Sequence, residues 1–325
     1  MITCVPGFAV GHASDFENVT GCSVILCPPG TVGSVDIRGS AAGTRQLDAL
    51  LGLHIVEEID GVFLSGGSAF GLDAAGGVME FLEEGGRGFD VTVTRVPVVP
   101  SAVIYDLSLG NCRVRPDKAM GYAACLAARP EFQGSGSLGA GTGASVGKLF
   151  GIRQATKGGL GSTCLKGPDG LLVGALAVVN AFGDVVDPDT GVIVAGARTT
   201  PDSHEFADSA ALIRQGIVRQ RFGESNTTIG VVATNARLTR EQAQKIAQMG
   251  QNGLARTIRP VHTLFDGDLV FVLAHPEVAV DLHIVGLLAQ TALETAILTA
   301  VREADGLGVL PSCRDLQRRR QSSPR

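Results

Sequence analysis

Three short apolar runs constrain the fold of this 325-residue chain more than any other feature. Each run is long enough for one strand and is apolar almost throughout, without the alternation of a strand that faces water on one side. Such a run predicts a strand buried on both faces, inside a layered structure. The runs are Leu171–Val179, Thr228–Thr234 and Leu269–Ala274.

Helical patterns follow two of these runs. Thr239-Arg-Glu-Gln242 matches a capping box that opens a helix to about Asn252. A long apolar helix, from about Val278 to Val301, comes after the third run. Strands that alternate with helices predict an α/β fold of stacked layers, but the pattern does not give the order of the strands.

The first part of the chain continues this alternation. We expect strands at Cys22–Leu26 and Gly61–Leu64, and helices at Leu72–Glu84, Asp117–Arg129 and Pro201–Phe222. Ser68 or the backbone near it is placed to cap the helix from Leu72. Residues 1–305 are predicted to form one catalytic domain, and the polar residues 306–325 a disordered tail.

Composition argues against two classes of partner. The net charge is −5, the isoelectric point is about 5.7 and aromatic residues make up 5%, so a nucleic-acid partner is not expected. Polar residues such as Asp281 and Glu294 interrupt the helix at 278–301, which indicates a core helix and no membrane span. No signal-peptide pattern opens the chain, so we expect a cytoplasmic protein.

No metal or cofactor site is predicted. The six histidines are dispersed, and the seven cysteines are scattered without a C-x-x-C pair, so we expect reduced, buried thiols. Gly134–Gly139 matches a dinucleotide-binding pattern but does not follow a strand. Gly147-Lys148 resembles the end of a phosphate-binding loop, but Leu149 stands where Ser or Thr is needed. We set both motifs aside.

The junction between Asn226 and Thr227 carries a different kind of chemistry. A polar segment, Gly223-Glu-Ser225, runs here directly into a buried strand. If the Thr227 hydroxyl attacked the Asn226 carbonyl, an N–O acyl shift followed by hydrolysis would free Thr227 with its own α-amine. That amine has a pKa of about 8 and can act as general base for the hydroxyl. From these residues alone, an Asn-Thr turn before a strand is the other interpretation.

Several motifs in a fixed order resemble the DmpA-type aminopeptidase family, the L-aminopeptidase/D-esterases. The resemblance extends to about Gly306, and an ordered set of motifs is more specific than any single one. The matching segments are Val10-Gly-His-Ala-Ser-Asp15, Thr20-Gly-Cys-Ser-Val24, Ser65-Gly-Gly-Ser-Ala-Phe-Gly-Leu-Asp-Ala74, Lys157-Gly-Gly-Leu-Gly-Ser162, Val179-Asn-Ala-Phe-Gly183, Asn226-Thr-Thr-Ile-Gly230 and Asp266-Gly-Asp268.

The resemblance implies a fold and a maturation step. The family fold is a four-layer αββα sandwich, similar to the N-terminal-nucleophile hydrolases but differently connected. Its members cleave themselves before a Ser or Thr, which corresponds here to the Asn226–Thr227 bond and to fragments 1–226 and 227–325. Members are commonly homo-oligomers, often tetramers.

The resemblance also assigns roles to other residues. Asn180 is implied as an oxyanion-hole donor, since a fixed N–H stabilises the developing charge. Asp266 and Asp268 match a pair that contacts the nucleophile and its amine, although some relatives have Ser at the first position. The loop Gly66-Gly67-Ser68 is expected to line the site with backbone N–H groups, and Tyr105 to line the pocket. Lys157 lies in a matching motif without a definite role.

The sequence therefore predicts an aminopeptidase with Thr227 as nucleophile, acting on a small peptide or amide through an acyl-enzyme. Three alternatives stay open. One is an amidase for a non-peptide amide, such as a pantetheine-type or β-amino acid substrate. Another is an acyltransferase that passes the acyl group to an amine, and the third is an uncut relative without activity.

Overall fold

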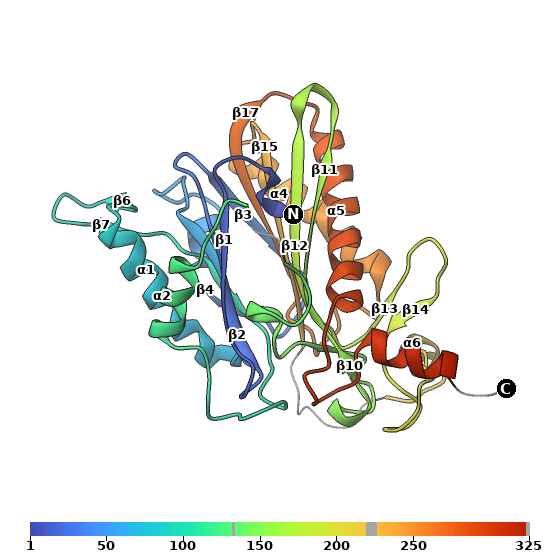
Figure 1. The fold of residues 1–325 in the computed structure, drawn as a ribbon. Coiled ribbons are helices and arrows are strands. Elements are labelled where there is room, and N and C mark those ends of the chain that lie inside the picture. Colours follow the sequence, from blue (N-terminus) through green and yellow to red (C-terminus); the bar gives the residue numbers. More distant parts are fainter. Residues whose placement is uncertain (132–133, 219–225, 323–325) are drawn as a thin grey trace.

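Two five-stranded sheets stack face to face between two pairs of helices (Figure 1). The structure is a computed structural model that describes residues 1–131, 134–218 and 226–322. Helices cover the outer face of each sheet, which gives four layers in the order α, β, β, α. The predicted αββα sandwich is confirmed.

The first sheet has the strand order β1-β2-β5-β8-β4. Its strands are β1 (Ala9–Asp15), β2 (Thr20–Leu26), β5 (Gly61–Ser65), β8 (Ser101–Val103) and β4 (Gly43–Arg45). Helices α1 (Ala75–Glu84) and α2 (Lys118–Leu126) pack on its outer face through a cluster that includes Val24, Phe63 and Val78. Asp117 caps α2, because its carboxylate accepts the Met120 N–H at 2.9 Å.

The second sheet has the order β11-β12-β15-β17-β3, and it holds the three apolar runs side by side. Its strands are β11 (Gly159–Lys166), β12 (Leu172–Asn180), β15 (Thr227–Ala236), β17 (Leu269–Val278) and β3 (Val32–Ile37). Helices α4 (Arg240–Thr257) and α5 (Leu282–Arg302) cover its outer face. The capping box predicted at Thr239 and Gln242 is present.

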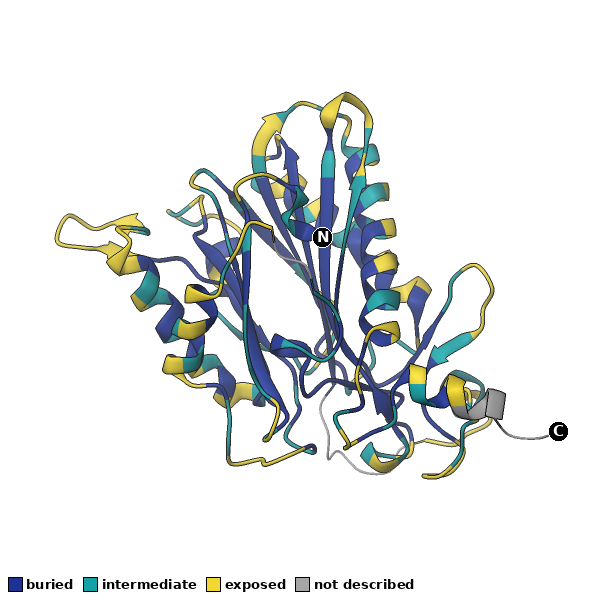
Figure 2. Cartoon of the chain, viewed as in Figure 1, coloured by how far each residue is buried: buried dark blue, intermediate teal, exposed yellow. Residues whose placement is uncertain are grey.

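Side chains of the central strands alternate between two buried clusters. In β12, Val173 and Val179 pack toward α4 and α5, whereas Leu176 and Val178 pack between the sheets. Figure 2 accordingly shows the central strands of this sheet mainly in dark blue, the colour of buried residues. This double burial is why the three runs are apolar almost without interruption.

Helix α5 is long and apolar enough to cross a membrane by length and composition. Its face with Ala289, Leu293 and Ile297 is fully buried in the cluster that α5 forms with α4 and the second sheet. The predicted core helix is therefore confirmed.

Three predicted helices are shorter than expected, and α2 covers only Lys118–Leu126 of the predicted 117–129. Helix α1 begins at Ala75, after a 3-10 segment η3 (Ser68–Ala74), and no side chain caps either one, so the predicted cap from the Ser68 side chain is wrong. Within 201–218 only α3 (Ser209–Arg214) is helical, because Gly216 takes a φ of +87° and ends it. Residues 219–222 of that predicted helix lie outside the described residues.

The predicted disordered tail is wrong for residues 306–322. Leu310 and Leu316 are buried, and helix α6 runs over Cys313–Ser322. The Lys157 N–H donates to Pro311 O at 3.0 Å, which ties this segment to the body. Apolar anchors spaced along a polar sequence explain why composition alone misled the prediction. Residues 323–325 lie outside the described part of the chain.

The prediction that all seven cysteines are reduced is also wrong. Cys4 and Cys164 form a disulfide with a Cα–Cα distance of 6.2 Å across a sequence separation of 160. The N-terminal turn η1 (Ile2–Cys4) reaches β11, where Ile2 N–H donates to Ser162 Oγ at 2.7 Å. Sequence spacing carries no signal for a contact created by the fold. The other five cysteines form no disulfide, and of these Cys112 is exposed.

Three smaller sheets complete the described chain. The hairpin of β6 and β7 projects beyond α1 (Figure 1), while the other two surround the end of β12. Their strands are β6 (Phe89–Asp90), β7 (Arg95–Val96), β9 (Ser145–Val146), β10 (Thr156–Lys157), β13 (Asp184–Val186), β14 (Ile193–Ala195) and β16 (Ile258–Arg259).

Candidate active site

The last residue of β12 and the first residue of β15 face each other across the second sheet. These residues are Asn180 and Thr227, which are direct partners in the antiparallel register. Both are buried, at 0% and 3% exposure. The fold therefore joins the two residues predicted to be the oxyanion donor and the nucleophile, although their sequence positions do not indicate that they are neighbours.

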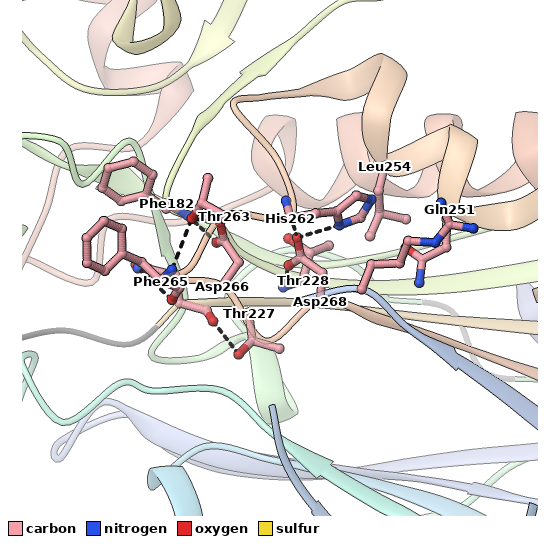
Figure 3. A network of polar contacts seen from close by, with 12 residues as sticks. Phe182, Thr227, Thr228, Gln251, Leu254, His262, Thr263, Phe265, Asp266 and Asp268 are labelled. Carbon is pink, nitrogen blue, oxygen red and sulfur yellow. Dashed lines mark hydrogen bonds and ion pairs between the residues drawn. The ribbon is translucent and has the colours of Figure 1, made fainter. Parts of the chain in front are cut away.

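The peptide bond before Thr227 is held firmly (Figure 3). Thr227 Oγ1 donates to Asn226 O at 2.5 Å, which is the dashed line at Thr227 in Figure 3. Gly267 N–H donates to the same oxygen at 2.7 Å. Asn226 N–H donates to Phe265 O at 2.9 Å. The Asn226 carbonyl thus lies against the hydroxyl that would attack it and against a backbone donor.

The Asn180 side chain is fixed by groups on both of its polar atoms. Its Oδ1 accepts from Lys148 Nζ at 2.7 Å and from Ser145 N–H at 3.0 Å. Its Nδ2 donates to Tyr105 O at 3.1 Å. An amide nitrogen has two hydrogens, and the second one has no protein partner among the described residues. This is the geometry of an oriented donor.

Lys148 is a site residue that the sequence analysis missed. It is 2% exposed, and its Nζ binds both the main-chain carbonyl of Asn180, at 3.0 Å, and the side-chain Oδ1. The phosphate-loop comparison considered Gly147-Lys148 only as a local motif. A lysine between Val146 and Leu149 in a Gly-rich apolar stretch was a usable signal, because a buried lysine needs specific acceptors.

Asp266 lies beside the nucleophile but binds other residues. Its Oδ1 accepts from Phe182 N–H at 3.0 Å, and its Oδ2 from Thr263 Oγ1 at 2.5 Å and Thr263 N–H at 3.2 Å. Burial, and next the neighbouring charge of Asp268, raise the pKa of Asp266 to about 6.

Asp268 binds on the other side of Thr227. Its Oδ1 accepts from Thr228 N–H at 2.7 Å, one residue past the nucleophile, and its Oδ2 lies 3.0 Å from both His262 N and Nδ1. Strand β17 begins only at Leu269, so the two carboxylates precede the strand. Neither carboxylate makes a hydrogen bond with Thr227 in the described, uncut chain: Asp268 binds Thr228 and His262, and Asp266 binds Phe182 and Thr263. Contact with the free amine of Thr227 stays a prediction.

The loop Gly66-Gly67-Ser68 does not offer its N–H groups to a ligand. Gly66 N–H donates to Gly21 O at 2.9 Å, Gly67 N–H to Asp106 Oδ1 at 2.7 Å, and Ser68 N–H to Ile104 O at 3.0 Å. The expected binding of a carboxylate or carbonyl oxygen by these N–H groups is therefore wrong. Glycine is needed at 66, because a Cβ there would lie 2.1 Å from Asp106 Oδ2.

Asp106 connects that loop to the active site. It is buried, and burial raises its pKa, while Thr20 Oγ1 donates to Oδ2 at 2.7 Å. The preceding residue is Tyr105, half-buried, whose carbonyl accepts from Asn180. Tyr105 also lines a small cleft with Ser145 and Lys148, which does not include Thr227. Its expected place in the substrate pocket stays a prediction.

Lys157, for which the sequence assigned no role, is fully buried near this connection. Its Nζ donates to Gly141 O at 3.3 Å and to Gly158 O at 3.2 Å. Burial lowers the pKa of Lys157 to about 7, against the opposing effect of Asp106 and Asp305. Its contacts are with backbone carbonyls, which supports a role in holding the glycine-rich segments together.

The assembled groups fit acyl-transfer chemistry. A threonine hydroxyl stands beside an oriented amide donor, a buried lysine and two buried carboxylates, which are the parts needed to attack a carbonyl and stabilise its oxyanion. Within the described ranges, no group of three or more His, Cys, Asp or Glu side chains is placed to hold a metal ion.

Fold and site together fit an enzyme that attacks amides, and the family match identifies its class as a hydrolase. The family model described as peptidase family S58 matches residues 1–309. The chain belongs to this family, the DmpA-type aminopeptidases, as the sequence motifs predicted.

Relatives and solved structures agree with this assignment. The chain is 40% identical to an uncharacterized aminopeptidase of Mycobacterium leprae over 96% of its own length and 92% of the relative's. It is 33% identical to the 6-aminohexanoate-oligomer endohydrolase of Kocuria sp., over 84% and 74% of the two lengths. The L-aminopeptidase D-Ala-esterase/amidase of Ochrobactrum anthropi has the same fold, with a TM-score of 0.71, 18% identity, and coverage of 98% and 92%.

Proposed function

We propose that this hydrolase activates itself by cleaving the Asn226–Thr227 bond, and that Thr227 then acts as its N-terminal nucleophile. The observation that carries the proposal is the contact of 2.5 Å between Thr227 Oγ1 and the carbonyl oxygen of Asn226. Thr227 is also the register partner of Asn180, the oriented amide donor.

Turnover then follows from the positions of these groups. The free α-amine of Thr227 takes the proton of Oγ1, and the oxygen attacks the substrate carbonyl. The second Nδ2 hydrogen of Asn180 stabilises the oxyanion, while Lys148 holds Oδ1 and so fixes the amide's direction. The leaving amine takes a proton as the acyl-enzyme forms, and water releases the acid.

The cut would leave the fold intact. Fragment 227–325 supplies β15 and β17, which lie between β12 and β3 of fragment 1–226. The disulfide joins Cys4 and Cys164, both in fragment 1–226, so it does not link the two fragments. We expect the two fragments to purify together.

For the substrate we propose the N-terminal residue of a short peptide. A second candidate is a linear amide oligomer of an ω-amino acid, which the likeness to a 6-aminohexanoate-oligomer endohydrolase favours. Chromatography of products from free peptides, N-acetylated peptides and 6-aminohexanoate oligomers separates the two. An aminopeptidase needs the free amine, whereas an endohydrolase also cuts the blocked peptide or internal oligomer bonds. Product analysis with and without an acceptor amine tests acyl transfer, because a transferase would form the new amide in preference to the free acid.

The test of self-cleavage is a pair of neighbouring substitutions. Thr227→Ala should remain a single chain without amidase activity. Thr228→Ala is the matched control, because the Thr228 hydroxyl makes no hydrogen bond in the described structure, and it should still be cut. Intact mass spectrometry reads both results. Cleavage of the Thr227→Ala chain at the same bond would place the nucleophile elsewhere.

A further inference from the structure

We propose that the backbone N–H of Gly267 is the oxyanion donor of the self-cleavage step, separate from Asn180, the donor for substrate turnover. The assignment rests on the self-cleavage proposed above. It gives the Asp266-Gly267-Asp268 segment a catalytic part that acts once in the life of each molecule.

The scissile carbonyl is held by a short piece of parallel ladder. Asn226 pairs with Asp266, so that Asn226 N–H donates to Phe265 O at 2.9 Å and Gly267 N–H donates to Asn226 O at 2.7 Å. Asn226 is fully buried. The carbonyl oxygen therefore has a fixed direction and a donor at the distance that an oxyanion requires.

Buried contacts on both sides hold this donor in place. Before Gly267, the Asp266 carboxylate is bound to Phe182 and Thr263, and Asp266 O accepts from Ala41 N–H at 2.9 Å. After it, the Asp268 carboxylate accepts from Thr228 N–H at 2.7 Å. Figure 3 shows these two groups on either side of Thr227. A donor fixed in this way needs no reorganisation when charge develops.

Only glycine leaves room for this arrangement. A Cβ at position 267 would lie 2.8 Å from Thr227 Oγ1, 2.8 Å from Ala41 O and 2.8 Å from Ala42 Cα. The hydroxyl and the N–H can share one carbonyl because no side chain stands between them.

The chemistry balances without an external reagent except water. Thr227 Oγ1 bonds to the Asn226 carbonyl carbon, and the carbonyl oxygen takes negative charge against Gly267 N–H. The carbon–nitrogen bond then breaks, and the proton that left Oγ1 ends on the Thr227 nitrogen, which gives an ester. Water adds to the ester carbon, releasing the Asn226 carboxylate and returning the hydroxyl to Thr227.

Gly267 serves the carbonyl oxygen of Asn226, whereas Asn180 serves the oxyanion of the substrate. Its Oδ1 is held by Lys148 and Ser145, and its Nδ2 is bound to Tyr105 O. Removal of its amide should therefore reduce turnover more than self-cleavage, whereas loss of the Gly267 N–H should do the reverse.

An amide-to-ester replacement removes this single N–H. Glycolic acid is incorporated in place of Gly267 by codon suppression in cell-free synthesis, and cleavage of the full chain is followed by intact mass. We expect cleavage to slow by about 10²–10³-fold, the usual effect of one oxyanion donor. The same replacement at Gly30, whose N–H binds the Glu58 carboxylate at the surface, is the matched control and should cleave like wild type.

The outcomes separate this assignment from the self-cleavage itself. An uncut wild-type chain contradicts self-cleavage. If the wild-type chain is cut, and the ester chain is cut at a rate within about threefold of the wild-type rate, the Gly267 assignment is contradicted but self-cleavage is not. If thermal unfolding shows that the ester chain does not fold, Asn180→Ala decides. If Asn180→Ala is still cut but has lost turnover, the two steps use separate donors. Equal loss of self-cleavage and turnover would contradict separate donors.

Discussion

Two short loops near the active site both contain glycine and differ in what their N–H groups contact. In the loop Gly66-Gly67-Ser68, all three N–H groups donate to the protein's own acceptors. In the loop Asp266-Gly267-Asp268, the glycine N–H donates to the carbonyl of the proposed cleavage bond. A glycine-rich loop thus binds a reacting group only where the fold leaves its donors directed at one.

The buried carboxylates of the two loops differ in the same way. Asp106 ties the first loop to Thr20 and to the Tyr105 turn, so it holds the scaffold on which Asn180 rests. Asp266 and Asp268 bind the residues that surround Thr227. We therefore expect changes at the first loop to affect stability and changes around the second loop to affect chemistry.

The largest expected effect is at Asn180, whose Nδ2 donates to Tyr105 O near the first loop and whose strand partner is Thr227, near the second. Asn180→Ala removes the oriented amide, and turnover should fall by about 10²–10³-fold with a smaller change in KM. Steady-state kinetics on the cleaved enzyme measures this effect. Lys148→Met, which removes the group on Asn180 Oδ1, should lower kcat in the same direction. Normal kcat in both variants would remove Asn180 from the mechanism.

The next largest effect is a pH dependence of the free energy of unfolding, which arises from Asp266 in the second loop. The pKa of Asp266 is about 6 in the folded chain, above its ordinary value of 3.8. Between these values the folded state binds a proton that the unfolded state does not, so stability falls as pH rises through this window. The difference between these two pKa values corresponds to about 3 kcal/mol in the free energy of unfolding across the window.

Urea unfolding of the uncut Thr227→Ala chain from pH 4 to pH 7 measures this slope. Asp266→Asn in that background should flatten it. Asp184→Asn is the comparison, because burial also raises the pKa of Asp184 to about 6, and Asp184 binds Ala197 and Ser209. An unchanged slope in Asp266→Asn would contradict the burial of a protonatable carboxyl beside the nucleophile.

The smallest effect tests the first loop as a scaffold. Gly66→Ala places a Cβ 2.1 Å from Asp106 Oδ2 and should lower the free energy of unfolding by about 1–3 kcal/mol, while self-cleavage continues. Gly76→Ala, inside α1, meets only the flexible Lys118 side chain and should change stability by about 1 kcal/mol or less. Thermal unfolding and intact mass are read together. Normal stability with blocked cleavage in Gly66→Ala would reverse the roles of the loops.

Periodicity and composition were enough to predict most of the layers. The runs at 171–179, 228–234 and 269–274 became adjacent strands, because burial on both faces leaves a strong local signal. The capping box at Thr239 was equally local. Ordered motifs identified the family and pointed to Asn180 and Thr227.

Contacts between distant segments could not be predicted. The register that pairs Asn180 with Thr227 depends on which strands become neighbours, and the bond from Phe182 to Asp266 spans 84 positions. The disulfide of Cys4 and Cys164 and the contact of Lys148 with Asn180 depend on the fold in the same way. A loop's sequence also does not reveal whether its N–H groups are already bound.

The most direct test of self-cleavage is the mass and N-terminal sequence of freshly purified wild-type protein. We predict two co-purifying fragments, 1–226 and 227–325, the smaller of which begins Thr-Thr-Ile-Gly. A single stable chain of 325 residues that hydrolyses amides, or a fragment beginning at another residue, would contradict Thr227 as the N-terminal nucleophile.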